Sequence, residues 1–407
     1  MKTELTQTHL NSARGQRADN ILRSCVHCGF CNATCPTYQL LGDELDGPRG
    51  RIYQIKQLLE GQPATHSMQT HLDRCLTCRA CETTCPSGVD YHSLLDIGRE
   101  LVDEQLPRSL PQKFLRRALV FFLGNTQRAK LLFGTARLFR PLLPSGLKHK
   151  IPTVGRIPRI RSDTHTRRML LLDGCVQPAA APQINAAARL VFDKLGIELH
   201  TAGQVGCCGA LQHHLDDAQG GLDKARANIN AWWPAIEAGC EAIVITASGC
   251  APMVKDYASL LADDPMYAER AVQVSKLAKD VSEVLSTEDL GAFSPREVQR
   301  IAFHSPCTLQ HGQQLNGCVE TLLTNLGFKL VDVKDAHLCC GSAGTYSILQ
   351  AKLSNRLREQ KLGALQEKQP ELIATANIGC LLHLQQGTDI PVVHWLELFV
   401  TTQLTRH

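Results

Sequence analysis

Short apolar segments alternate with longer amphipathic segments in the second half of the chain. Four uncharged runs of apolar or small residues lie at 169–172, 242–246, 301–303 and 372–375. Runs of this kind predict strands buried on both faces, as in parallel sheets. Apolar residues at helical spacing in 184–195 and 222–238 predict helices between the strands. This alternation predicts an α/β architecture with parallel sheets.

The N-terminal region, residues 1–104, is predicted to be helical. Residues 1–24 form a polar helical stretch, and residues 52–61 place apolar side chains at helical spacing before a glycine. Pro48 suits the start of that helix. Arg49 and Arg51 follow it, and we expect surface or capping arginines there, with contact to a metal cluster or to a partner as the alternative.

Two cysteine runs in this helical region share the spacing C-x2-C-x2-C-x3-C-P. This is the spacing of ferredoxins with two 4Fe–4S clusters, in which the fourth cysteine of each run binds the cluster of the other run. We therefore predict two 4Fe–4S clusters with crossed ligands. The expected ligands are Cys25, Cys28, Cys31 and Cys85 for the first cluster, and Cys75, Cys78, Cys81 and Cys35 for the second.

Disulfide bonds and zinc are the alternative uses of these cysteines. The chain has 18 cysteines among 407 residues, with 43% hydrophobic and 20% charged residues, a composition typical of a soluble globular protein. The polar start predicts no secretory signal, and no apolar run reaches membrane-spanning length, so we expect a reducing cytoplasm, where disulfides are rare. A third cysteine at the same spacing, followed by Cys-Pro, is not a zinc-ribbon pattern.

Residues 105–168 are strongly basic. They contain 15 Lys or Arg and one acidic residue, whereas the whole chain has a net charge of +4. Apolar and basic positions at 114–123 and 128–140 can separate onto opposite helix faces, and the prolines between 141 and 158 predict an extended linker. We expect a helical connector packed on its own domains, with peripheral contact to the cytoplasmic face of the inner membrane as the alternative. The segment has no nucleic-acid-binding motif, so nucleic acid is not expected as a partner.

The α/β region contains an internal repeat of cysteines. In each copy, one cysteine is followed 32 residues later by Cys-Cys-Gly, and a fourth cysteine comes after a later predicted strand. Because the carboxyl ends of parallel strands meet at one edge of a sheet, each set of four thiols is expected to form a further iron–sulfur or zinc site. A redox disulfide and reduced, metal-free thiols are the alternatives. The two sets are Cys175, Cys207, Cys208 and Cys250, and Cys307, Cys339, Cys340 and Cys380.

Two further cysteines, Cys240 and Cys318, fall outside the repeat and are expected to be structural. Together the patterns predict four parts. They are a helical domain with two clusters at 1–104, the basic connector at 105–168, and two pseudo-symmetric cysteine-rich α/β repeats at 169–290 and 291–407.

The repeat resembles the cysteine-rich "CCG" domain family of heterodisulfide reductase subunits and lactate-utilisation proteins. Its union with a two-cluster module resembles the iron–sulfur subunits of anaerobic glycerol-3-phosphate dehydrogenase and, most closely, of glycolate oxidase. The likeness covers nearly the whole chain and is clearest at 25–31 (CVHCGFC), 40–51 (LLGDELDGPRGR), 228–239 (NINAWWPAIEAG) and 339–346 (CCGSAGTY). Heterodisulfide reductase modules end in C-x-x-C, whereas no second cysteine follows Cys250 or Cys380 at that spacing. The noncubane cluster of heterodisulfide reductase is therefore not expected in this chain.

The resemblance implies an electron-transfer subunit of a glycolate oxidase or dehydrogenase complex. The chain has no G-x-G-x-x-G motif and no P-loop, so no flavin or NAD site and no catalytic residue is expected in it. A flavoprotein partner would oxidise glycolate to glyoxylate, and this chain would pass the electrons to a quinone-type acceptor. The alternatives are the same role in a lactate or glycerol-3-phosphate dehydrogenase, and a thiol/disulfide catalyst of the heterodisulfide reductase kind.

Overall fold

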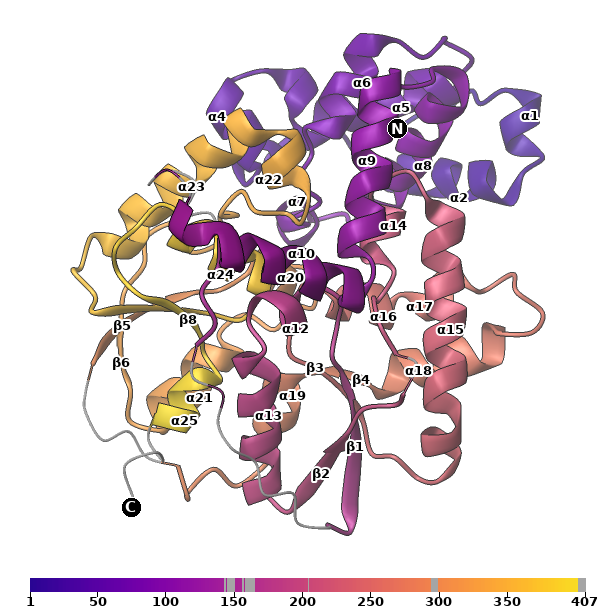
Figure 1. Ribbon diagram of the computed structural model, residues 1–407. Helices are drawn as coiled ribbons and strands as arrows, with labels where there is room; N and C mark the ends of the chain where they lie inside the picture. Colours follow the sequence, from indigo (N-terminus) through magenta and orange to yellow (C-terminus); the bar gives the residue numbers. More distant parts are fainter. Residues whose placement is uncertain are drawn as a thin grey trace.

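An all-helical N-terminal region lies at one end of the molecule and two parallel sheets lie at the other (Figure 1). The computed structural model describes residues 1–142, 144, 151–155, 157, 165–203, 205–293 and 299–401. The N-terminal elements are α1 (Gln7–Leu10), α2 (Ala13–Ser24), α3 (Phe30–Ala33), α4 (Pro36–Leu41), η1 (Glu44–Asp46), α5 (Pro48–Leu59), α6 (His66–Asp73), α7 (Ala80–Thr83) and α8 (Tyr91–Gln105).

Packing of α5 against α8 forms the centre of the N-terminal region. Pro48 occupies the first turn of α5, where a missing N–H costs nothing, and Asp90 caps the N-terminus of α8 by accepting a bond from the Ser93 N–H. The helices approach closely at Gly98, where an added Cβ would lie 2.5 Å from Cγ1 of Ile55. Apolar residues of both helices are buried at this contact, so α5 and α8 together support the two cysteine loops.

A buried ionic network lies beneath the second cysteine loop. The carboxylate of Asp46 is 3.5 Å from the Arg51 guanidinium, 3.0 Å from Nδ1 of His71 and 2.9 Å from the Arg74 guanidinium. Arg51 also donates to the His71 carbonyl and to the Thr37 hydroxyl. The expectation of a surface or capping residue at Arg51 was wrong, because its side chain is fully buried.

Each half of the α/β region contains one four-stranded parallel sheet of the same topology. The strand orders are β2-β1-β3-β4 and β6-β5-β7-β8, so the predicted fold class is confirmed. In the first sheet Leu170 pairs with His200 and with Ile243, and in the second Ala302 pairs with Val331 and with Ile373.

The elements of the two halves follow one another in chain order. Those of the first half are β1 (Arg167–Leu172), α12 (Gln177–Ala180), α13 (Gln183–Lys194), β2 (Ile197–His200), α14 (Ala210–His213), α15 (Ala218–Glu237), β3 (Ile243–Ile245), α16 (Ala251–Lys255), α17 (Tyr257–Leu260), α18 (Ala268–Leu277), β4 (Ala278–Asp280) and α19 (Val281–Leu285). Those of the second are β5 (Arg300–His304), α20 (Cys307–Gln310), α21 (Cys318–Asn325), β6 (Lys329–Val331), α22 (Tyr346–Leu349), α23 (Ala351–Gln366), β7 (Leu372–Thr375), α24 (Ile378–Gln385), β8 (Val392–His394) and α25 (Glu397–Thr401).

The two halves share one hydrophobic core. A single cluster of buried side chains runs from Leu171 and Phe192 of the first half to Ile373 and Trp395 of the second. Polar contacts also join the halves, since the Ser248 N–H donates to the Ala376 carbonyl and Nε2 of His394 lies 3.0 Å from the Thr246 carbonyl. The carboxyl ends of the two sheets are therefore held in a fixed relation.

Two exposed helices, α9 (Leu110–Leu123) and α10 (Thr126–Phe139), with the short η2 (Arg140–Leu142), run from the N-terminal region across the α/β region (Figure 1). The Arg116 guanidinium is 3.5 Å from Asp73 and 3.0 Å from Asp216, and Arg137 donates to the carbonyls of residues 152, 179 and 180. These two arginines therefore attach the helices to the body of the protein. Half of the proline-containing tail predicted as a linker, residues 143, 145–150, 156 and 158, lies outside the described residues. No helix in the described parts of the chain is long and apolar enough to cross a bilayer.

Asp46→Asn should destabilise the N-terminal region. The substitution keeps the shape of the side chain but leaves the buried Arg51 without its carboxylate, and breaking a buried ion pair costs about 3–5 kcal/mol. We expect a lower midpoint of the first unfolding transition in urea, measured by circular dichroism under anaerobic conditions. Glu44→Gln is the control, because its pair with Arg49 is more exposed and should matter much less. Equal midpoints for the two variants would contradict this role of Asp46.

Candidate metal centres

The first cysteine set surrounds a hollow at the surface of the N-terminal region. Its lining includes the four predicted ligands of the first cluster, together with Gly29, Tyr91 and Cys81. The thiol of Cys28 is exposed, and the neighbouring Val26 and Phe30 are 68% and 61% exposed. The structure therefore brings the set together at an edge that another molecule can reach. The four cysteines are Cys25, Cys28, Cys31 and Cys85.

The second cysteine set surrounds an adjoining hollow. Its lining includes the four predicted ligands of the second cluster, and Cys81 borders both hollows. The hydroxyl of Tyr91 donates to Sγ of Cys75 at 3.6 Å, and the Thr37 hydroxyl lies 3.3 Å from Sγ of Cys35. The buried Arg51 also lines this hollow, so a positive charge lies next to the thiols. The four cysteines are Cys75, Cys78, Cys81 and Cys35.

Both cysteine loops use the same unusual backbone conformation. His27 and Gly29 have φ of 59° and 88°, and their counterparts Thr77 and Arg79 have φ of 52° and 58°. The left-handed region is costly for residues other than glycine, and such strain persists where the surrounding structure demands it. Alternating left-handed residues turn the loop tightly, which places three thiols of one run on the same side.

The second cysteine loop packs against the second α/β repeat. Cys78 and Leu76 pack with Cys307, Cys339 and Tyr346 in one small apolar cluster. The Tyr346 hydroxyl donates to the Arg74 carbonyl at 3.2 Å, which fixes this contact between the N-terminal region and the repeat. Burial, together with the nearby Cys307, raises the pKa of Cys78 well above its usual range. A neutral thiol is thus favoured unless a metal binds the sulfur as a thiolate.

The first α/β repeat brings its predicted cysteines together at the carboxyl end of its sheet. The Cys207 thiol is in hydrogen-bonding contact with those of Cys175 and Cys208, and the Cys208 thiol with that of Cys250. Gly209, with φ of 95°, turns the chain, and its N–H donates to Sγ of Cys207 at 3.4 Å. Hydrogen bonds from Cys175 and Cys208 lower the pKa of Cys207.

The second repeat gathers its four thiols in the same way. The thiols of Cys307 and Cys339 are 3.8 Å apart, and the Cys340 thiol contacts those of Cys339 and Cys380. The Gly341 N–H donates to Sγ of Cys339 at 3.4 Å, the same contact that Gly209 makes in the first repeat.

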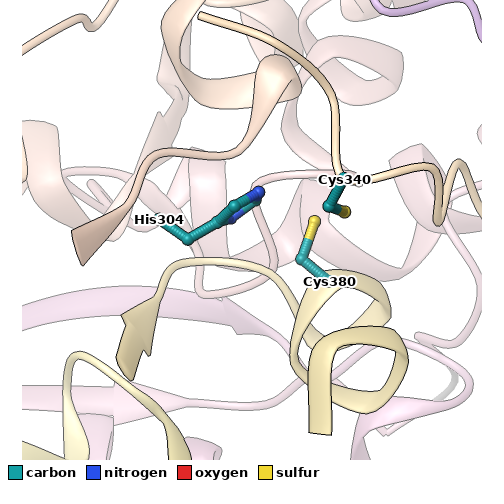
Figure 2. Close-up of side chains that lie close together, drawn as sticks. All are labelled: His304, Cys340 and Cys380. Carbon is teal, nitrogen blue, oxygen red and sulfur yellow. The ribbon is translucent and has the colours of Figure 1, made fainter. Parts of the chain in front are cut away.

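A histidine joins this second set, and the sequence analysis missed it. His304 ends β5 and lies beside Cys340 and Cys380 (Figure 2), with one ligand atom from each residue within 4.8 Å of the others. Burial lowers the pKa of His304 to about 3, so the ring is neutral at neutral pH. Its place three residues before Cys307, at the end of a predicted strand, was the only available signal.

The remaining cysteines bond to backbone carbonyls outside these sites. Sγ of Cys240 lies 3.1 Å from the Ala242 carbonyl, and Sγ of Cys318 lies 3.6 Å from the Ser282 carbonyl. Both contacts agree with a structural role.

The N-terminal residues fit two iron–sulfur clusters by their chemistry. Each hollow is lined by four or more cysteines and by mostly apolar atoms, and soft thiolates in an apolar surrounding are the usual ligands of such clusters. Gly29 also borders the first hollow, and its lack of a side chain leaves room for the Arg49 guanidinium, which would lie 2.5 Å from an added Cβ.

Comparison with known proteins agrees with this chemistry. Residues 21–89 match the family model of a 4Fe–4S dicluster domain, and residues 169–255 and 301–385 each match that of a cysteine-rich domain. The chain is 53% identical over 402 residues to the glycolate oxidase iron-sulfur subunit of Escherichia coli (strain K12), covering 98% of both chains.

Two more distant relatives have related names. The probable glycolate oxidase iron-sulfur subunit of Bacillus subtilis (strain 168) is 29% identical, covering 96% of this chain and 94% of the relative. Lactate utilization protein A of Exiguobacterium sp. is 25% identical, covering 55% of this chain and 93% of the relative. The chain therefore carries a 4Fe–4S dicluster domain and two cysteine-rich domains, and it belongs to the family of glycolate oxidase iron–sulfur subunits.

Proposed function

We propose that this chain carries electrons from flavoprotein subunits that oxidise glycolate to glyoxylate, and delivers them to a quinone-type acceptor. The oxidation releases two electrons and two protons, which a flavin can accept as a pair. A 4Fe–4S cluster, when bound, supplies single-electron transfer. The full-length likeness to a glycolate oxidase iron–sulfur subunit supports the choice of substrate.

The observation that carries the proposal is the row of thiol sites through the molecule. The first cysteine set has an exposed edge, the two hollows share Cys81 as a border, and Cys78 packs against Cys307 and Cys339. One end of the row has the exposed Cys28, which a redox partner can reach, whereas the other end packs against the second repeat. This arrangement suits a relay better than it suits a site for an organic substrate.

The residues around each hollow would set the properties of the relay. Arg51 places a buried positive charge beside the second set. A positive charge near a cluster stabilises the reduced cluster and so raises its reduction potential. Tyr91 donates a hydrogen bond to Cys75, which acts in the same direction. The first hollow is open to solvent near Cys28. We therefore expect the two centres to differ in reduction potential.

We further propose that each four-cysteine set in the repeats holds a metal centre, either iron–sulfur or zinc. The pairwise contacts between thiols in both repeats support this proposal, because unligated buried thiols gain little from lying next to one another. The thiol/disulfide alternative is less well supported. The paired cysteines are 1–4% exposed, so a disulfide substrate could not reach them without a rearrangement. The lactate alternative rests on relatives that cover about half of the chain.

We also propose that α9 and α10 form a peripheral membrane contact. Of the 19 exposed large hydrophobic residues in the described part of the chain, ten lie between Leu110 and Leu142. The same stretch carries seven Lys or Arg and no acidic residue. An apolar and basic surface of this kind suits an anionic lipid surface. Because Arg116 and Arg137 bind the body of the protein, the basic side chains that would face lipid are others, such as Lys113, Arg117 and Lys130.

The purified chain alone should not oxidise glycolate. It should show iron–sulfur absorption and EPR signals under anaerobic conditions, and it should reduce an artificial acceptor with glycolate only after the flavoprotein subunits are added. Glycolate turnover by the flavin-free chain would contradict the proposal.

Cys35→Ser should damage the second cluster and Cys85→Ser the first. Cys35 belongs to the first cysteine run but lines the second hollow, and Cys85 belongs to the second run but lines the first hollow. An oxygen donor replaces a soft sulfur poorly, so the affected cluster should be lost or lose one iron. EPR of the reduced variants checks this assignment, with Cys240→Ser as the control outside both hollows. Damage confined in each variant to the cluster of its own run would show that the ligands are not crossed.

Reversing three charges on α9 and α10 should weaken membrane binding. Lys113→Glu, Arg117→Glu and Lys130→Glu together should lower binding of the complex to anionic vesicles by on the order of 100-fold or more, since each basic residue contributes about 1 kcal/mol near such a surface. Co-sedimentation with vesicles measures the effect. The same net change at the exposed Lys276, Lys352 and Lys368 is the control. If both triple variants bind as the native complex does, the helices act only as a connector.

A further inference from the structure

His304 is a buried histidine with one ring nitrogen unsatisfied. Its side chain is 2% exposed, and Nδ1 lies 3.0 Å from the Thr375 hydroxyl. Within the described residues Nε2 has no hydrogen-bond partner. Buried polar atoms are nearly always paired, so an unpaired ring nitrogen points to a partner that is not a protein atom.

The position of the ring identifies the kind of partner. His304 from β5, Cys340 from the loop after β6 and Cys380 from α24 converge from three separate elements (Figure 2). One ligand atom from each lies within 4.8 Å of the other two. Two donor atoms that bind the same metal ion with bonds of about 2.0–2.3 Å are separated by less than the sum of the two bonds, which agrees with the separations seen here.

The other buried histidines of the second repeat are different. Nε2 of His394 lies 3.0 Å from the Thr246 carbonyl, and Nε2 of His383 lies 3.1 Å from the Ser354 hydroxyl. Both rings therefore have protein partners, and His304 is distinguished by its unpaired nitrogen as well as by its position.

The first repeat lacks this histidine. Cys175 and Cys307 are equivalent in the repeat, so the residue that corresponds to His304 is Leu172. Leu172 ends β1, is 2% exposed and packs in an apolar cluster. The two sites thus have the same four thiols but differ in one nitrogen donor.

We propose that Nε2 of His304 is a metal ligand in the site of the second repeat, together with Cys340 and Cys380, and that the equivalent position of the first repeat, Leu172, supplies no ligand. The metal is of the kind that accepts both thiolate and imidazole, namely iron in a cluster or zinc. With Nδ1–H donating to the Thr375 hydroxyl, the lone pair of Nε2 faces the thiols and the ring is held in place. This inference rests on the proposed metal centre in that repeat.

The test compares metal retention in anaerobically purified full-length chains. His304→Ala should lose the metal of the second repeat to a chelator at least ten-fold faster than the native chain, and added imidazole should slow the loss. Iron, sulfide and zinc counts identify the metal. His394→Asn is the matched control, as it changes a buried histidine of the same repeat that lies outside the thiol set and should retain the native rate.

Cys380→Ser separates this inference from the metal site on which it depends. If Cys380→Ser speeds the loss and His304→Ala does not, the site exists and the histidine is not a ligand. If neither variant changes the metal content or the rate of loss, the metal site itself is wrong, and the inference fails with it.

The ligand can also be identified in the native chain, so that the result does not depend on whether a variant folds. With ¹⁵N-labelled histidine, pulsed EPR of the reduced chain should show nitrogen coupled to an iron centre. If the metal is zinc, absorption at the zinc edge should show imidazole scattering. A native chain that shows neither would overturn the assignment of His304.

Discussion

The constraint on which the structure depends is the burial of anionic sulfur. A thiolate in an apolar site is unstable unless a metal or a cation compensates its charge, and burial, together with the nearby Cys307, raises the pKa of Cys78 well above its usual range. The chain brings Arg51 to the same hollow and packs Cys78 against the second repeat. Metal binding and the packing of the N-terminal region against the repeat are therefore expected to be coupled, because each favours the other.

The same constraint accounts for the strained loops. His27, Thr77 and Arg79 adopt left-handed conformations that glycine tolerates far better. They turn the backbone so that three thiols of one run face one hollow, and the helices α3 and α7 begin directly after the turns. The frame of α5 and α8 and the buried carboxylate of Asp46 hold these turns in place. Energy stored in the loops is thus offset by packing elsewhere in the N-terminal region.

Much of the fold could be predicted from the sequence, because the central strands are continuous apolar runs. Residues 169–172 and 372–375 lie within β1 and β7 as expected. The edge strand β4 has the sequence Ala-Lys-Asp, with its middle residue exposed, so it has no apolar run from which it could be predicted. The cysteine sets could be predicted because metal ligation imposes spacing. Arg51 was misjudged because its burial depends on the distant Asp46 and His71, and His304 was missed because its partners come from other elements.

The central claim is that electrons from glycolate pass through the clusters of this chain. Rapid freeze-quench EPR of the complex, mixed anaerobically with glycolate in the absence of an acceptor, tests it most directly. The account predicts that iron–sulfur signals of this chain appear at least as fast as one catalytic turnover. Reduction of the flavin alone, with the clusters still oxidised after many turnover times, would contradict it.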